Sequence, residues 1–199
     1  MFEQKNIGTA GFRFRRIEKK KAAKGFWGIG NKMRIAVCPG SFDPVTKGHL
    51  DIITRACGLF DRVIVAVSVN ADKSPSFTFE ERAALIKTCT AHLPNLEVDV
   101  MNELLANYVR RVGACAIVKG LRAVSDFEYE FQMALANKKL NPDAETVFLT
   151  TRHQNMYLSS SLVKQIAGFG GDISDFVPAE ILDVVKKRFD HGTENQGGM

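Results

Sequence analysis

From Met33 onward, short apolar runs alternate with amphipathic segments, and this alternation limits the fold more than any other feature of the sequence. The apolar runs have the length of buried strands, and we place strands at residues 35–38, 63–67, 96–101, 115–118 and 145–150. Apolar residues at helical spacing predict helices over residues 49–60, 78–92, 104–112, 125–140, 160–167 and 179–189. Strand and helix in alternation predict an α/β fold, with a single doubly wound, five-stranded parallel sheet covered by helices on both faces.

Positive charge is concentrated in the first 32 residues. The whole chain has a net charge of +5, but residues 1–32 alone carry nine Lys and Arg against two Glu, so the rest is slightly acidic. This glycine-containing leader lacks a periodic apolar face, and disorder is expected. Three explanations of this leader remain open: a mis-assigned start with Met33 as the true initiator, a flexible basic tail, or a transit peptide. The predicted organisation is a leader over 1–32, one domain over 33–190 and a frayed tail over 191–199.

Cysteine spacing and hydropathy indicate the cellular compartment in which the protein works. The four cysteines lie far apart in apolar stretches, without a C-x-x-C pair, so we expect buried thiols in a reducing cytoplasm. No apolar run reaches the ~18 residues that a membrane span needs. We therefore expect a cytoplasmic protein that uses neither a membrane nor, given its slightly acidic body, nucleic acid as a partner.

The first polar cluster follows the first strand, in the segment Pro39–His49. Gly40 and Gly48 let the backbone approach a ligand, and the start of the following helix offers free N–H groups to phosphate. His49 can donate a hydrogen bond to a phosphate oxygen as charge develops in a transition state. Taken alone, the segment could equally be a strand-to-helix turn with a capping histidine.

Two more clusters follow the fourth and fifth strands. In Lys119–Glu130, two cations flank a glycine at a strand end, which suits a polyanion, although a bare K-G-x-R is more often a solvated pair. In Tyr157–Lys164, three serines stand at a helix start, where they can bind phosphate or simply cap the helix. Carboxyl ends of parallel strands meet at one edge of a sheet, so the three clusters should form one site.

Together these strings resemble a known family. The first resembles the T/S-F-D-P-x-T-x-G-H signature of the nucleotidyltransferase superfamily, with Thr46 at the first His position of its broader H-x-G-H form. The second resembles R-G-L-R-x-x-x-D-F-E-Y-E, and the third resembles I-S-S-S. This combination resembles the bacterial phosphopantetheine adenylyltransferase branch over residues 33–190. The resemblance implies a Rossmann-like nucleotidyltransferase fold and adenylyl transfer from ATP to 4′-phosphopantetheine, which yields dephospho-coenzyme A and pyrophosphate.

The resemblance also implies residue roles. The implied catalytic residues are His49, Lys73 and Arg122. The implied contacts of the acceptor are Ser41, Lys73, Leu105 and Lys119. The implied contacts of ATP are Ser41, Phe42, His49, Gly120, Leu121, Arg122, Glu130, Asn155, Met156, Tyr157, Leu158, Ser159, Ser160 and Ser161. Lys119 departs from the family's usual Arg and keeps the charge without the bidentate fork, and Gln165 replaces a common acidic residue.

Cofactor and partners follow from the same resemblance. Because no carboxylate cage is apparent, Mg²⁺ is expected to arrive with ATP, with no protein ligand to the metal. The family implies a homohexamer in which coenzyme A acts as a feedback ligand. Two alternatives remain: another small nucleotidyltransferase, acting on nicotinamide mononucleotide or with a cytidine nucleotide, and a nucleotide-binding module without catalysis.

Overall fold

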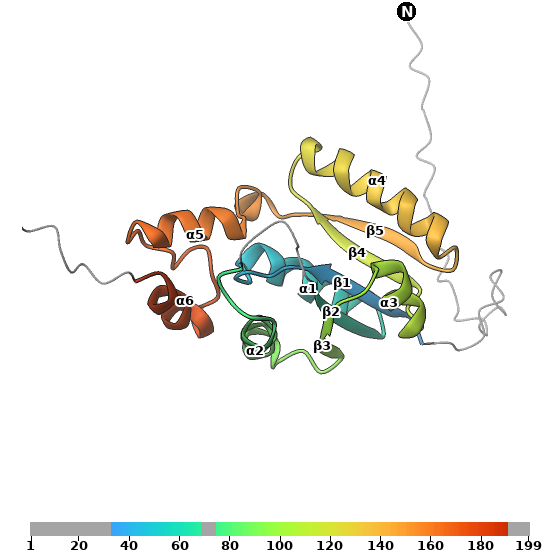
Figure 1. Cartoon of the computed structure of the whole chain (residues 1–199), viewed down its shortest axis with the longest axis horizontal. Coiled ribbons are helices and arrows are strands. Elements are labelled where there is room, and N and C mark those ends of the chain that lie inside the picture. Colours follow the sequence, from blue (N-terminus) through green and yellow to red (C-terminus); the bar gives the residue numbers. More distant parts are fainter. Residues whose placement is uncertain (1–32, 69–74, 191–199) are drawn as a thin grey trace, which may run out of the picture. The chain divides into compact units, whose positions relative to one another are not determined.

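The computed structural model describes residues 33–68 and 75–190 (Figure 1). The predicted leader over 1–32, the tail over 191–199 and the candidate residue Lys73 lie outside these described residues. Within them, no helix is long and apolar enough to cross a membrane.

The central element is a five-stranded parallel sheet with the order β3-β2-β1-β4-β5. Its strands are β1 (Ile35–Gly40), β2 (Arg62–Ser68), β3 (Leu96–Met101), β4 (Ala116–Leu121) and β5 (Glu145–Thr150). The chain builds outward from β1 to β3 and then returns to place β4 on the other side of β1. This reversal leaves a crevice beyond the carboxyl ends of β1 and β4, where parallel α/β sheets bind their ligands. The predicted doubly wound α/β fold is confirmed.

Helices cover both faces of the sheet (Figure 1). They are α1 (Lys47–Leu59), α2 (Phe79–Thr90), α3 (Leu105–Arg111), α4 (Val124–Leu140), α5 (Ser160–Gly168) and α6 (Leu182–Phe189), with short 3₁₀ turns η1 (His153–Asn155) and η2 (Ala179–Ile181). Along β1, Ala36 and Cys38 pack into the core shared with α1, α2 and α6, whereas Val37 packs into a second core with α3. Because both faces are buried, the central strands are continuous apolar runs.

Several predicted boundaries need correction. β4 continues to Leu121, so Lys119 and Gly120 belong to the strand and not to a loop after it. Helix α4 starts at Val124 with Ala123 as its N-cap, one residue before the predicted start at residue 125. Helix α2 starts with a reciprocal capping box, since the Thr78 side chain accepts the Glu81 N–H and the Thr78 N–H donates back to the Glu81 carboxylate.

The cysteines also differ from expectation in one case. All four are free thiols, and Cys38 and Cys89 are buried as predicted. Cys57 is half-buried, but Cys115 is exposed because it precedes β4 at the amino-terminal edge of the sheet. That edge lies at the opposite end of the strands from the crevice.

Candidate active site

A cleft of about 790 Å³ opens at the carboxyl ends of the strands, at the point where the strand order reverses between β1 and β4. All three polar clusters contribute to its wall. Of the residues proposed from the sequence, the cleft is lined by Ser41, Phe42, His49, Leu105, Lys119, Gly120, Arg122, Glu130, Asn155, Leu158, Ser159, Ser160 and Ser161. Leu121, Met156 and Tyr157 are not among the lining residues, and the last two are exposed. Segments far apart in the sequence therefore meet in one site.

His49 is fixed at the first turn of α1 by a reciprocal capping box with Thr46. The Thr46 N–H donates to His49 Nδ1 over 3.1 Å, and the His49 N–H donates to Thr46 Oγ1 over 3.3 Å. Burial, followed by the nearby charge of Arg122, lowers the pKa of His49 to about 4. The ring is therefore neutral near pH 7, and since Nδ1 accepts a hydrogen bond, Nε2 carries the ring proton. A neutral N–H donor is thus available in the cleft.

Phe42 adopts a left-handed backbone conformation with a φ of 49°. Its ring is buried and lies edge-on to His49, with 5.2 Å between the ring centroids. A Cβ atom on Gly40 would come within 2.9 Å of that ring, so only glycine leaves room for it. A non-glycine residue with positive φ is strained, and such strain persists where the surroundings enforce it. The sequence motif thus encodes an enforced backbone shape at the cleft.

Asp43 joins the turn after β1 to two other segments. Its buried carboxylate accepts the N–H groups of Ser76 and Phe77 over 3.0 and 2.9 Å and pairs with Lys164 of α5. A carboxylate that accepts two backbone N–H groups and a lysine is well compensated for its burial. Asp43 was assigned no role from its sequence pattern, but its contacts make it an anchor of the cleft wall.

Both cations at the β4–α4 junction are paired with carboxylates. Lys119 Nζ lies 3.1 Å from Glu130 Oε2, and Arg122 Nε donates to Asp126 Oδ2 over 2.9 Å. Arg122 also donates to the carbonyl of Leu158 over 2.9 Å. This hydrogen bond links the β4–α4 junction to the loop before the serines.

Asp126 lines the cleft and was missed as a functional residue, although its i, i+4 spacing from Arg122 was a usable signal. Burial by itself would raise the pKa of Asp126, but the hydrogen bonds and charge of Arg122 outweigh it and hold the pKa below its usual range. Asp126 is therefore ionised at neutral pH and available to orient the guanidinium.

The serine cluster starts α5, with Ser159 as the N-cap that accepts the Leu162 N–H over 3.1 Å. The Ser160 hydroxyl donates to the carbonyl of Pro44 over 2.8 Å. Ser161 forms no such hydrogen bond within the described residues and lines the cleft. One serine thus caps the helix, one fixes the neighbouring turn, and the free amino end of α5 faces the site.

The donor set suits an anion better than a metal ion. The carboxylates of Asp126 and Glu130 are each engaged by a cation, and no cluster of three His, Cys, Asp or Glu occurs among the described residues. Two cations, a neutral histidine and two helix amino ends converge on the cleft. Such a site can bind and polarise phosphoryl groups.

The sheet order and this phosphate-type site define an α/β nucleotidyltransferase class of protein. The cytidylyltransferase-like family model matches residues 37–166. Relatives named phosphopantetheine adenylyltransferase are 57% identical in Caldanaerobacter subterraneus subsp. tengcongensis, over 79% of this chain and 98% of the relative, and 56% identical in Alkaliphilus metalliredigens, over 78% and 99%. The chain belongs to the phosphopantetheine adenylyltransferase family, as the sequence motifs indicated.

Solved structures support the fold. A bifunctional NMN adenylyltransferase/ADP ribose pyrophosphatase from Francisella tularensis gives a TM-score of 0.62 at 16% identity, covering 80% of this chain and 50% of that one. The nicotinic acid mononucleotide adenylyltransferase of Plasmodium falciparum gives 0.60 at 15% identity, covering 82% and 100%. At these identities the likeness establishes a shared Rossmann-like fold and nothing about the substrate.

Proposed function

We propose that this protein transfers the adenylyl group of ATP to 4′-phosphopantetheine and releases dephospho-coenzyme A and pyrophosphate, a step of coenzyme A biosynthesis. The observation that carries the proposal is the meeting of three motif segments in one cleft at the switch point of the sheet. Relatives that are 52–57% identical over nearly their whole length carry the name of this activity. The first support is geometric, and the second comes from sequence similarity.

The reaction is a direct displacement at phosphorus. An oxygen of the acceptor phosphate forms a bond to the α-phosphorus of ATP, the bond from that phosphorus to the α–β bridging oxygen breaks, and pyrophosphate leaves with the electron pair. His49 Nε2 donates to a non-bridging α-phosphate oxygen, and Arg122 neutralises charge on the leaving group. Catalysis by positioning needs no covalent intermediate on the protein.

Two subsites share the cleft. The nucleotide side consists of the Ser41–Phe42 backbone, the first turn of α1, Arg122 and the amino end of α5. The acceptor side consists of Ser41, Lys119 and Leu105, with Lys73 proposed to join them from outside the described residues. Lys119 is held by Glu130 in the free protein, so an acceptor phosphate has to compete with or share this pair.

Mg²⁺ is proposed to enter with ATP, held by the triphosphate oxygens. The cleft fits this arrangement, because its two acidic side chains are already engaged by cations and the remaining donors are hydrogen-bond donors. When bound, the ion would neutralise part of the charge on the phosphates. Arg122 and the helix amino ends would then orient the complex.

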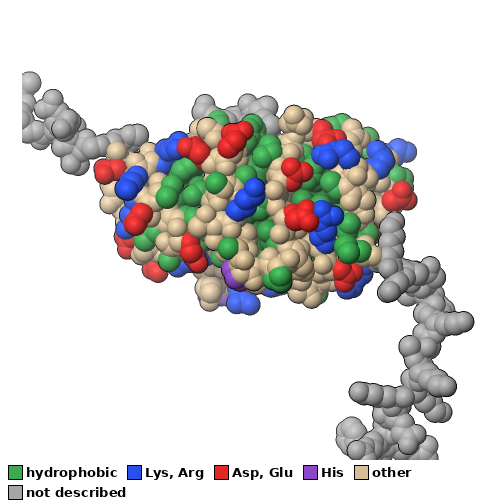
Figure 2. Space-filling model, turned by 90° about the horizontal axis from the view of Figure 1, so that it is seen from below, with side chains coloured by type: hydrophobic (Ala, Val, Ile, Leu, Met, Phe, Trp, Pro, Cys, Tyr) green, Lys and Arg blue, Asp and Glu red, His purple; other side chains and the backbone are tan. Residues whose placement is uncertain are grey.

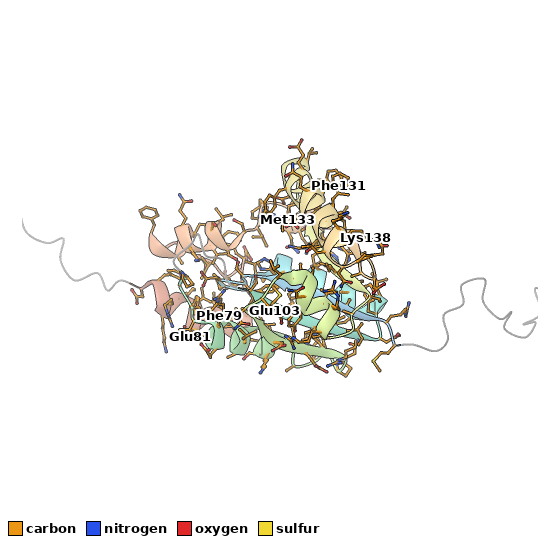
Figure 3. All side chains as sticks on the ribbon, turned by 45° about the vertical axis from the view of Figure 1, so that its right-hand side comes forward. Phe79, Glu81, Glu103, Phe131, Met133 and Lys138 are labelled. Atoms are coloured by element: carbon orange, nitrogen blue, oxygen red, sulfur yellow. The ribbon has the colours of Figure 1, made fainter. Side chains whose placement is uncertain are left out.

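Self-association into a homohexamer is proposed from the family and supported by α4. Val124, Phe127, Phe131 and Leu135 are exposed at helical spacing along it, and Phe131 is marked in Figure 3. Apolar stripes of this kind mark protein interfaces. A particle mass six times that of the chain in analytical ultracentrifugation would support the hexamer, and a monomer mass would contradict it.

The remaining partners and the compartment are proposed from the family. Coenzyme A, which contains the product, is proposed as a feedback ligand of the same cleft, and the cytoplasm is proposed as the compartment. A nucleic-acid partner is not proposed, because Figure 2 shows acidic and basic side chains interspersed over the face in view instead of a basic patch.

The test is a pyrophosphate-release assay with Mg²⁺, ATP and a panel of phosphorylated acceptors. We expect turnover with 4′-phosphopantetheine and a product with the mass of dephospho-coenzyme A. Nicotinamide mononucleotide as acceptor and CTP as donor serve as controls and should give little turnover. Preference for either control would replace the proposed reaction with that of another nucleotidyltransferase. ATP binding without turnover on any acceptor would favour a binding module.

A further inference from the structure

Arg82 is a buried cation directly behind the cleft wall. It lies on α2 and is only 2% exposed. Its Nη1 donates to the carbonyl oxygens of Ser41, over 2.8 Å, and Ser68, over 3.4 Å. Its guanidinium carbon lies 4.5 Å from the centre of the Phe79 ring, which Figure 3 labels on the first turn of α2. Arg82 therefore ties together the segments that follow β1 and end β2, and both Ser41 and Ser68 line the cleft.

The contact with Ser41 fixes the direction of one peptide group. In a trans peptide the C=O and the next N–H point in opposite directions. Because the Ser41 carbonyl points at the buried guanidinium, the Phe42 N–H points away from it, to the side where the cleft lies. No hydrogen bond of the Phe42 N–H occurs within the described part of the chain. The left-handed φ of Phe42 belongs to this same peptide and is held in place by the arginine and by the buried ring.

The charge of Arg82 also differs from that of the other cations near the cleft. Lys119, Arg122 and Lys164 each pair with a carboxylate, whereas Arg82 forms no ion pair with any described residue. Burial lowers the pKa of Arg82, and the nearby charges of Asp43 and Glu80 offset part of this effect, but an arginine remains protonated in proteins. A buried charge that lacks an ion pair is costly unless other groups compensate it. The backbone carbonyls and the two nearby carboxylates compensate part, and an anion in the cleft would add to this compensation.

We propose that Arg82 is a positioning residue for the phosphates of the nucleotide. It acts through the Ser41–Phe42 peptide, whose N–H it aims at a phosphate oxygen, and it adds a fixed positive charge behind the cleft wall. It does not touch the substrate itself, because it is not among the residues that line the cleft. The identity of the anion as ATP rests on the proposed function.

The test compares ATP with adenosine, which lacks phosphates, as ligands of the wild type, Arg82→Met and Arg82→Lys. Calorimetry should show the ATP Kd of Arg82→Met rising about 10–150-fold, as for loss of a hydrogen bond to a charged group. The adenosine Kd should stay within about twofold, and kcat should fall about 10²-fold or more, as for loss of one oxyanion donor. Arg82→Lys keeps the charge but lacks the planar guanidinium whose Nη1 donates to the Ser41 and Ser68 carbonyls while Nε donates to that of Thr78, so it should restore part of the ATP affinity.

Arg110→Met is a control for the loss of an arginine-to-carbonyl hydrogen bond, because the exposed Arg110 donates to the carbonyl of Leu140 and does not line the cleft. It should leave both affinities and kcat unchanged. If Arg82→Met weakens ATP and adenosine equally, or changes neither affinity nor kcat, the proposal is wrong. If Arg82→Met does not fold, Arg82→Lys takes its place in the comparison. The proposal is then wrong if Arg82→Lys weakens ATP and adenosine equally, or changes neither affinity nor kcat. Failure of the wild type to turn over 4′-phosphopantetheine would refute the proposed function separately, since the ATP comparison needs no acceptor.

Discussion

At the scale of single residues, His49 uses its two ring nitrogens for two tasks. Nδ1 accepts the Thr46 N–H and completes the capping box of α1, which leaves the Nε2 proton for the cleft. The sequence left open whether this histidine is a cap or a catalytic donor. The geometry makes the two roles compatible, because each nitrogen serves one.

Substitution of His49 separates these tasks. Gln at this position can rebuild the capping box with Thr46, whereas Ala cannot. We expect His49→Gln to keep the melting temperature near that of the wild type and to lower kcat by about 10²–10³, as for loss of one transition-state donor. His49→Ala should lower kcat as much and also cost about 1 kcal/mol of stability through the lost cap. A loss of turnover below about fivefold in His49→Gln would show that the histidine serves only as a cap.

The ionisation of His49 is a second prediction at this scale. The folded pKa of about 4 lies below the ordinary value of 6.5, so between these pH values the unfolded chain binds a proton that the folded protein does not. The His49 contribution to stability is therefore complete above about pH 6.5 and is lost as the pH falls toward 4. NMR of the ring protons should show no His49 titration between pH 8 and 5.5. A midpoint near 6.5 would contradict the buried, neutral state.

Individual site residues could be predicted from the sequence only where they belong to one of the three motif segments. His49, Arg122 and the serines were proposed because their segments resemble the family's motifs, and the structure brings these segments together in one cleft. Arg82 and Asp43 were missed because their effect depends on contacts across more than 30 residues of sequence, which no local pattern encodes. Lys73 stays a prediction, since it lies outside the described residues.

At the scale of elements, the β4–α4 junction shows where local patterns fail. The apolar run ends at Val118, so the sequence placed the end of the strand there, but pairing with β5 carries it on through Leu121. Register with Phe148 and Leu149 keeps Lys119 and Gly120 in the sheet, and such pairing is a tertiary effect. As a result the backbone of Lys119 is held by the pairing of β4 with β5 and does not belong to a loop.

The same junction predicts a division of labour between its cations. Lys119 stands in the strand and Arg122 one turn further, bound to the loop before the serines. We expect Lys119→Ala to raise the KM for phosphopantetheine about 10–150-fold with a smaller effect on ATP, and Arg122→Ala to do the reverse. Lys119→Arg, which restores the family's usual residue, should hold or improve acceptor affinity.

Steady-state kinetics with each substrate varied in turn distinguishes the two subsites. Glu130→Gln is a useful companion, because it frees Lys119 from its partner without removing the cation. If both cation variants affect both substrates equally, the cleft contains one shared phosphate cluster, and the proposed division into subsites is wrong.

At the scale of the whole molecule, the reversal of strand order concentrates the chemistry at one place. Turns after β1, β4 and β5 reach one cleft because their strands are parallel and lie side by side. The sequence predicted this architecture because strand and helix alternate so regularly, and the predicted fold is confirmed. The exposed stripe on α4 was not predicted, since its residues look like core in the sequence and only the fold shows that nothing covers them among the described residues.

Removal of residues 1–32 tests whether the described domain is sufficient for function. A stretch of 157 residues of this chain already matches 98% of a relative, and the site is assembled from residues beyond Met33. The net positive charge of the chain comes from the leader, which has no periodic apolar face with which to pack. We expect the truncated protein to keep kcat and both KM values within about twofold, and its melting temperature within about 2 °C, as for surface changes in general. It should also elute earlier from a cation exchanger, because it loses the basic leader. Aggregation or loss of turnover would show instead that residues 1–32 contribute to the folded domain.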